Sequence, residues 1–331
     1  MNRWLFSRWT HTGTTPRPRP ADRPVRLILD ALEDRLTPAA AFPEFLDPNP
    51  NPGNQFGATV VALSTGNVVI TSPFDDFAAT DAGAVYLFNG ATGALISTLR
   101  GSSANDQVGG GGVTALTNGN YVVRSQFWDN GAVGDAGAVT FGSGTAGING
   151  PVLAANSLVG TTANDIIGSD GVTALTNGNY VVRSQFWHNG AVATAGAATF
   201  GSGTTGIRGP VSAANSLVGT TANDNVGSDG VTALTNGNYV VRSQFWHNGA
   251  VATAGAATFG SGTTGIRGPV SAANSLVGTT ANDNVGNGRV TALTNGSYVV
   301  LSPRWDNGVV GLAGAATFGS GTAGISVHEI S

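Results

Sequence analysis

One stretch of eleven residues, Val-Thr-Ala-Leu-Thr-Asn-Gly-Asn-Tyr-Val-Val, occurs four times in this chain almost unchanged. The copies start at Val113, Val172, Val231 and Val290, so each begins 59 residues after the one before it. The two units that begin at Val172 and Val231 are identical over 56 positions. Self-similarity at a fixed period predicts an array in which one small structural unit packs on its copies.

The repeated stretch has the pattern of a β-hairpin. Val113 to Leu116 and Tyr121 to Val123 are short runs of β-branched, aromatic and aliphatic residues, and Asn118-Gly119 lies between them. Asn-Gly readily adopts the two positive φ values of a type I′ turn, whose twist matches that of paired strands. Each copy is therefore predicted to be a hairpin with a type I′ turn at its tip.

Composition agrees with an all-β class and excludes several kinds of site. Charged residues make up only 10% of the chain, hydrophobic residues reach 41%, and there are 50 glycines among 331 residues. Cysteine is absent, so neither disulfides nor thiolate metal sites are possible. Sparse charge and a net charge of −4 give no electrostatic footprint for nucleic acid.

Each unit is expected to contain four strands, and this predicts a β-propeller with five four-stranded blades of about 59 residues. The propeller domain is expected over residues 42–331, with repeats starting near 56, 108, 167, 226 and 285. The last unit stops before an Asn-Ser-Leu-Val sequence, so residues 43–47 are expected to complete the last blade and close the ring. The alternative is a β-solenoid, in which these two ends stay apart.

Residues 1–41 differ from the rest of the chain. They hold a Pro-rich run, Thr14 to Pro20, and seven of the 15 basic residues, which predicts a flexible basic leader or export segment. No apolar run in the sequence is long enough for a transmembrane helix. Leu32-Glu-Asp-Arg-Leu-Thr-Pro-Ala39 resembles a short motif near the N-termini of large surface or exported proteins of planctomycete bacteria. That resemblance implies an extracytoplasmic location, at the cell surface or secreted.

The first unit resembles the FG-GAP repeat of integrin-type propellers. Phe56-Gly57 supplies the FG pair, Thr71-Ser-Pro73 stands where GAP is expected, and Gly83 to Phe88 matches the third strand. The later units resemble a related repeat of bacterial surface proteins. Many FG-GAP repeats carry an Asp-rich calcium loop between the first two strands, but here the loop is Ser-Thr-Gly-Asn in the first unit and Thr-Asn-Gly-Asn or its close variant in the later ones. Because Ca²⁺ needs about 6–8 oxygen ligands, usually with several carboxylates, no metal site is carried over.

Four sets of side chains recur at equivalent positions and are candidates for function. The tryptophans could stack on sugars as ligand-facing residues, although large aromatic side chains more often anchor a core with the indole N–H paired to a carbonyl. The arginines could bind anions, but the first and last units place Ile70 and Leu301 there, which favours a half-buried position covered by an arginine stem. The sets are Trp128, Trp187, Trp246 and Trp305; Arg124, Arg183 and Arg242; Asp106, Asp165, Asp224 and Asp283; and His188 and His247.

The aspartates lie in Ala-Asn-Asp sequences, where a local turn is favoured over a calcium site. The two histidines could bridge a metal, but no third ligand is evident, so a polar loop residue is favoured. No catalytic motif is present, and near-identical units leave little room for one asymmetric catalytic site. We therefore expect a non-enzymatic surface scaffold for structure, adhesion or recognition of a protein or glycan, without a cofactor. The alternative is a carbohydrate- or calcium-dependent binding module.

Overall fold

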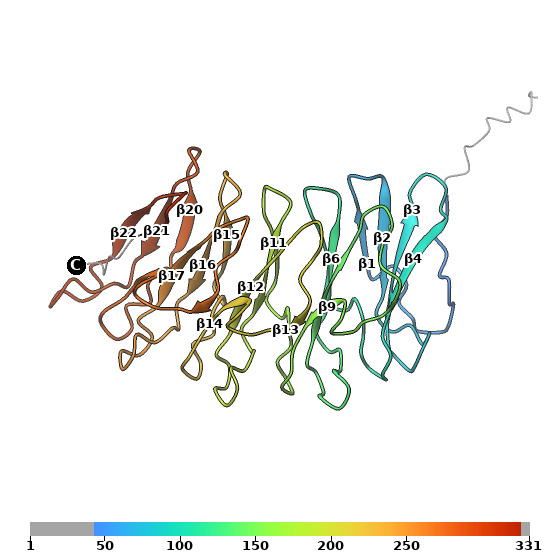
Figure 1. Ribbon diagram of the computed structural model, residues 1–331, viewed down its shortest axis with the longest axis horizontal. Helices are drawn as coiled ribbons and strands as arrows, with labels where there is room; N and C mark the ends of the chain where they lie inside the picture. The colour runs from blue at the N-terminus through green and yellow to red at the C-terminus, as the bar shows by residue number, and fades with distance from the viewer. Residues whose placement is uncertain (1–42, 326–331) are drawn as a thin grey trace, which may run out of the picture. The chain divides into compact units, whose positions relative to one another are not determined.

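The computed structural model describes residues 43–325, and these form an all-β structure of 22 strands in five sheets. Figure 1 shows the sheets following one another in chain order. The predicted all-β class and the five repeated units are confirmed. The predicted leader, residues 1–41, lies outside the described residues. Among the residues described, no helix is long and apolar enough to cross a membrane.

Each unit begins with a hairpin and adds a third strand beside it, as predicted. In the first four units a fourth strand then pairs antiparallel with the third. The strands of the first two units are β1 (Thr59–Ala62), β2 (Asn67–Ser72), β3 (Ala84–Asn89), β4 (Leu95–Arg100), β5 (Gly112–Ala115), β6 (Tyr121–Ser125), β7 (Ala138–Gly142), β8 (Gly150–Pro151) and β9 (Ser157–Val159).

The remaining three units repeat this order, and the described part of the last unit ends after its third strand. Their strands are β10 (Gly171–Ala174), β11 (Tyr180–Ser184), β12 (Ala197–Gly201), β13 (Gly209–Pro210), β14 (Ser216–Val218), β15 (Gly230–Ala233), β16 (Tyr239–Ser243), β17 (Ala256–Gly260), β18 (Gly268–Pro269), β19 (Ser275–Val277), β20 (Arg289–Ala292), β21 (Tyr298–Ser302) and β22 (Ala315–Gly319).

The hairpins are present, but the type I′ turn predicted at their tips is wrong. A type I′ turn needs positive φ at both central residues. Gly119 has φ +88°, whereas Asn118 is not among the residues with positive φ. Gly119 donates its N–H to the Leu116 carbonyl, and Leu116 donates to the Asn120 carbonyl. This is the longer connection, in which a type I turn is followed by one left-handed glycine.

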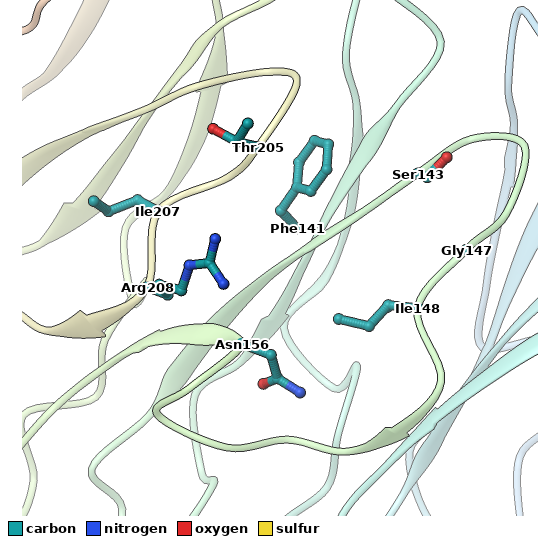
Figure 2. A pocket seen from close by; sticks show the side chains of 8 residues that line it. All are labelled: Phe141, Ser143, Gly147, Ile148, Asn156, Thr205, Ile207 and Arg208. Atoms are coloured by element: carbon teal, nitrogen blue, oxygen red, sulfur yellow. The ribbon is translucent and has the colours of Figure 1, made fainter.

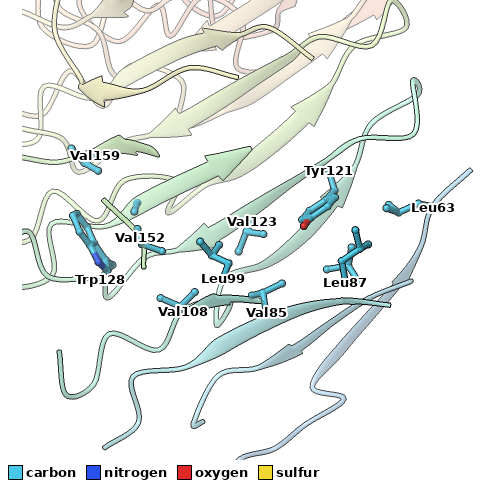
Figure 3. Close-up of a cluster of buried hydrophobic side chains, with 12 residues drawn as sticks. Leu63, Val85, Leu87, Leu99, Val108, Tyr121, Val123, Trp128, Val152 and Val159 are labelled. Atoms are coloured by element: carbon cyan, nitrogen blue, oxygen red, sulfur yellow. The ribbon is translucent and has the colours of Figure 1, made fainter. Parts of the chain in front are cut away.

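The core lies between the sheets, because the second strand of each of the first four units is buried on both faces. In β6, Tyr121 and Val123 pack against the first unit, whereas Val122 packs against the third. The same alternation recurs in β11 and β16, so each apolar cluster is shared by two consecutive units. Figure 3 shows one such cluster, with Val85 and Leu99 of one unit facing Val123 of the next. This explains why the Val-Val runs do not alternate with polar residues.

Short pairs of parallel β-strands, which were not predicted from the sequence, make a second link between units. The two-residue strands β8, β13 and β18 each leave their own unit and pair with the fourth strand of the preceding one. In the second of these, Gly209 lies opposite Leu158 and Pro210 opposite Val159. The first three sheets are therefore each extended by a piece of the following unit, which couples them to the next sheet through backbone hydrogen bonds as well as through side chains.

Ring closure by residues 43–47 is not observed. Phe45 packs on Phe88 of the first unit with ring centroids 5.4 Å apart, and Pro43 and Glu44 lie beside Gly93. Together with Phe56, Phe45 covers the outer face of the first sheet. The strand β22 pairs only with β21 among the described residues. The first strands also pack in chain order, β1 on β5, β5 on β10, β10 on β15 and β15 on β20. These contacts form an open series, and no closed propeller is shown.

Candidate functional site: pockets between the units

Three equivalent pockets lie at successive junctions between units. Their volumes are about 220 Å³ between the second and third units, about 160 Å³ at the next junction and about 280 Å³ at the last. Each has a phenylalanine from the third strand of one unit, an asparagine from the turn before its fourth strand, and an isoleucine from the following unit. These residues are Phe141, Asn156 and Ile207; Phe200, Asn215 and Ile266; and Phe259, Asn274 and Ile325.

The pockets exist because the fourth strand is short in these units. In the first unit β4 spans six residues and pairs with β3 as far as Phe88. In the second unit β9 has only three residues and pairs with Ala138 to Thr140 of β7. No fourth strand covers the edge at Phe141, the next residue of β7. The half-buried Phe141 side chain therefore forms a wall of an open pocket instead of part of a closed core.

The opposite wall is a loop of the following unit held against this phenylalanine. Gly206 has φ +71°, and a Cβ built on it would lie 2.6 Å from the Phe141 Cβ. Gly265 and Gly324 approach Phe200 and Phe259 in the same way. Only glycine fits at this position, because it combines a left-handed backbone with very close contact. The recurring glycines thus set the distance between the two walls.

Arg208 supplies the free polar group of the first pocket. Figure 2 shows its side chain reaching from the loop of the third unit toward Phe141 and Asn156. The side chain is exposed, and within residues 43–325 its guanidinium makes no hydrogen bond or ion pair to protein. Asn156 is already used, because its Oδ1 accepts the Leu153 N–H at 2.9 Å and its amide donates to the Pro151 carbonyl at 3.0 Å. Arg267 holds the equivalent place in the second pocket.

The first junction differs from the other three. Leu87 occupies the place of Phe141 and is fully buried. Asn149 occupies the place of Arg208, and its Oδ1 accepts the Thr98 N–H at 2.9 Å. The first junction therefore has neither an aromatic wall nor a free guanidinium. Recurrence of Phe141, Phe200 and Phe259 at the period of 59 was visible in the sequence, but the short fourth strand that exposes them was not.

The four recurring tryptophans are placed in the core. Trp128, Trp187 and Trp246 are each 4% exposed and Trp305 is 6% exposed. Trp128, Trp187 and Trp246 pack in the clusters shared between units, so little of their surface is open to a ligand. Their position supports the anchor interpretation, with one difference. The indole N–H groups are buried and have no hydrogen-bond partner, whereas a loop carbonyl was expected. Ser72 of the first unit and Ser125 of the second hold equivalent positions in their sheets. Counting three residues on from each serine aligns Asp75 of the first unit with Trp128 of the second.

The arginines of the second strands form a half-buried row. Arg124 donates to the Gly168 carbonyl at 3.3 Å, and Arg183 donates to the carbonyls of Gly227 and Asp170. Burial lowers the pKa of all three guanidinium groups, and the neighbouring Arg183 adds to the effect at Arg124. Each guanidinium donates to at least one backbone carbonyl, whereas its buried Nε has no hydrogen-bond partner among the described residues. We do not assign these arginines an anion site. The residue of the first unit at this position is Thr71 rather than Ile70, since Thr71 pairs with Thr59 as Arg124 pairs with Gly112.

The recurring aspartates tie two loops together. The Oδ2 of Asp165 accepts the N–H groups of Thr161 and Thr162, both at 2.9 Å, and its Oδ1 accepts the His188 N–H at 2.9 Å. Asp106, Asp224 and Asp283 repeat this pattern. The carboxylate closes a local turn through residues that precede it, as the preference for a local turn expected, and it also bonds a loop 23 residues further on, which was not expected. Burial raises the pKa of Asp106.

Each histidine lies beside one of these aspartates. The His188 Nδ1 is 3.0 Å from the Asp165 Oδ1, and His247 makes the same pair with Asp224 at 2.9 Å. Asp129 and Asp306 take this place in the second and last units. In residues 43–325 there is no cluster of three or more His, Cys, Asp and Glu side chains suited to a metal ion. The histidines therefore serve as partners of buried carboxylates.

Comparison with protein families identifies the repeat. A family described as "Repeat of unknown function (DUF5650)" matches residues 62–110, 115–169, 174–228, 233–287 and 292–329, which together cover most of the chain. The chain belongs to this family. The match includes the first unit, so all five units are copies of one repeat, and it provides no link to FG-GAP repeats or integrins. No curated protein matches the chain.

Proposed function

We propose that this member of the DUF5650 repeat family is a non-enzymatic recognition scaffold that binds a repetitive, carboxylate-bearing polymer along its row of pockets. The observation that carries the proposal is the recurrence of one pocket, with the same walls, at three successive junctions. A scaffold that presents the same site at a regular interval is suited to a ligand that repeats as well. Several weak sites then act together, because later contacts are intramolecular once one site is filled.

The chemistry of the lining favours a polysaccharide that contains uronic acids. The face of Phe141 and the side chains of Ile148 and Ile207 offer an apolar surface for the C–H face of a sugar ring. The free guanidinium of Arg208 can form a bidentate pair with a carboxylate. The volumes, about 160 to 280 Å³, are smaller than the roughly 300–1,000 Å³ of pockets for drug-sized ligands, so each suits one residue of a polymer.

Calorimetric titration with oligouronates of increasing length tests the proposal. We expect affinity to rise with chain length and to fall as salt is added. Replacing both Arg208 and Arg267 by alanine should weaken binding about tenfold or more, because a charge-assisted bond contributes roughly 1.5–3 kcal/mol. Arg289→Ala is the matched control, since this exposed arginine lies on β20, outside the pockets.

Two comparisons in the same titration separate the alternatives. Neutral glucans should bind more weakly than oligouronates, and chelation of calcium should leave binding unchanged. A calcium requirement would favour the calcium-dependent binding module instead. Equal binding by the double arginine variant and the wild type would refute the pocket row as the site.

We also propose a location at the cell surface or outside the cell. The support is the resemblance of residues 32–39 to a motif of exported planctomycete proteins, and these residues lie outside the described structure. Fractionation of cells that produce the full chain, followed by detection with antibody against the repeats, tests this. Recovery in the cytoplasmic fraction alone would refute it.

For the arrangement of the units we infer an open series in place of the closed propeller. Its support is the packing of Phe45 on Phe88 and the neighbour-to-neighbour order of contacts between first strands. Because the chain has no cysteine, a double variant with Phe45→Cys and Phe318→Cys contains two thiols at known positions and no others. A short bifunctional cross-linker should not join these positions within one chain, whereas a closed ring would allow it.

A further inference from the structure

Asparagine side chains join the hairpin of one unit to a loop of the following unit. Asn120 lies just after the hairpin turn of the second unit, and its Nδ2 donates to the Gly203 carbonyl of the third unit at 2.7 Å. Its Oδ1 accepts the Gly144 N–H of its own unit at 2.9 Å. One side-chain amide is therefore bonded to two loops that belong to consecutive units.

These bonds continue from unit to unit in one direction. Gly203, whose carbonyl accepts from Asn120, donates its N–H to the Asn179 Oδ1 at 2.8 Å. The Asn179 Nδ2 then donates to the Gly262 carbonyl of the fourth unit at 2.7 Å. We call the whole series the asparagine ladder. Its members are Asn67, Asn120, Asn179 and Asn238 with Gly144, Gly203, Gly262 and Gly321.

The ladder glycines are closely surrounded. Gly203 is buried, and a Cβ built on it would collide with the carbonyl oxygen of Gly178, at the hairpin tip of its own unit. The same Cβ would lie 3.0 Å from the Nδ2 of Asn118, which also donates to the Gly203 carbonyl at 2.7 Å. The loop that contains Gly203 is thus fixed between the hairpin tips of two units.

The loops joined by the ladder are those that line the pockets. We call residues 143–148, 202–208, 261–267 and 320–325 the pocket loops. The first two line the first pocket from opposite sides. Ile207 of the second loop also lines the second pocket, and Ile266 of the third loop also lines the third pocket. Each pocket therefore has one ladder asparagine bonded to both of its loops, and two of the loops each line two pockets.

We propose that the asparagine ladder couples the pocket loops, so that filling one pocket raises the affinity of the next. The part that concerns affinity rests on the proposed function. A ligand that contacts Ile207 and Arg208 restrains the loop 202–208, which Asn179 joins to the loop 261–267. The second loop is then already ordered, so the next ligand loses less entropy on binding. Hydrogen bonds in series also polarise one another, so a break in one link weakens its neighbours.

Two substitutions of Asn179 break the ladder in different ways. Asn179→Asp keeps the acceptor for the Gly203 N–H and removes the donor to Gly262. Asn179→Ser adds no charge, and the last unit already has Ser297 at the equivalent position. Asn89→Asp is the matched control, because within residues 43–325 the Asn89 side chain accepts two N–H groups and donates none. Circular dichroism and the melting temperature check that the three variants are folded.

Amide hydrogen exchange in the ligand-free chain tests the coupling of the loops. Gly144 is the decisive residue, because its N–H bonds to Asn120, one unit away from the substitutions. A purely local effect of Asn179 would change exchange only at Gly203 and Gly262. We expect the Gly144 amide to exchange about fivefold faster in both Asn179 variants and at the wild-type rate in Asn89→Asp. Unchanged exchange at Gly144 in either Asn179 variant would overturn the coupling.

Titration with a uronic acid monosaccharide tests the coupling of the pockets. Nuclear magnetic resonance follows the guanidinium groups of Arg208 and Arg267, and a monosaccharide cannot bridge two pockets. We expect a Hill coefficient above one in the wild type and the control, and near one in both Asn179 variants. Independent sites in the wild type would overturn the coupling of affinities and leave the proposed function standing. Absence of binding by the wild type would overturn the proposed function, whereas the exchange experiment still decides whether the loops are coupled.

Discussion

Gly206 lies so close to Phe141 that a methyl group at position 206 would be 2.6 Å from the Phe141 Cβ. The contact joins two consecutive units, and Gly206 lies between Thr205 and Ile207, which line the first pocket together with Phe141. Since φ at Gly206 is +71°, alanine there meets both backbone strain and a clash. We expect Gly206→Ala to lower the free energy of unfolding by about 2–4 kcal/mol, measured by denaturant unfolding. Gly190→Ala is the control, with φ +61° and open space around it. If both variants lose the same free energy, the contact with Phe141 contributes nothing.

Trp187 is predicted to stabilise the fold through its volume and not through its indole N–H. The side chain is 4% exposed and packs in the cluster shared by the second and third units. Trp187→Ala should cost about 3–5 kcal/mol, as for other large aromatic truncations. Trp187→Phe should cost much less, because the buried Nε1 has no hydrogen-bond partner to lose. Neither variant should change binding of oligouronates per folded molecule. A large loss in the phenylalanine variant would mean that the N–H is bonded, for example to a buried water molecule.

Asp165 is predicted to be the more important member of its pair with His188. Its carboxylate accepts three backbone N–H groups, from Thr161, Thr162 and His188. Asp165→Ala leaves these donors without their acceptor, so we expect a loss of about 3 kcal/mol or more in the free energy of unfolding. His188→Ala should cost about 1 kcal/mol, because the ring contributes one bond from a partly exposed position. Thermal unfolding of the two variants in parallel checks the order, and an equal effect would contradict it.

The strands were predictable from the sequence because their cause is local. Val113 to Leu116 and Tyr121 to Val123 gave a hairpin whose strands the structure places at Gly112–Ala115 and Tyr121–Ser125. The turn type was not predictable from Asn118-Gly119 alone. A single left-handed residue at Gly119 satisfies a three-residue connection equally well, and the choice depends on how the flanking strands pair.

The arrangement of the units and the site could not be predicted for a different reason. A fixed period and four strands per unit suit both a ring and an open series, and the choice depends on angles between sheets that no single residue encodes. Phe45 illustrates this, because an aromatic residue near the start of the array can cover either the first sheet or the last. Phe141 is similar, since its exposure results from the shortness of β9 rather than from the residue itself.

The stability of the fold is predicted to fall in alkali because of buried tyrosines. Burial raises the pKa of Tyr121 to about 12, from an ordinary value near 10. A phenol is neutral when protonated, so the folded chain keeps a proton that the unfolded chain loses between these values. The contribution of Tyr121 to the free energy of unfolding is therefore fully present below about pH 10 and is lost as the pH rises to about 12. The loss amounts to roughly 3 kcal/mol.

Denaturant unfolding at several pH values, with tyrosinate absorbance followed in parallel, measures this loss. Tyr121→Phe keeps the ring beside Val123 and removes the titrating group. Between about pH 10 and pH 12, the free energy of unfolding should fall less in this variant than in the wild type, and the difference is the contribution of Tyr121. The other buried tyrosines, whose pKa values burial also raises, remain in both proteins and cancel in the comparison. Identical pH dependence in the two proteins would show that Tyr121 is ionised as readily in the folded chain as in the unfolded one.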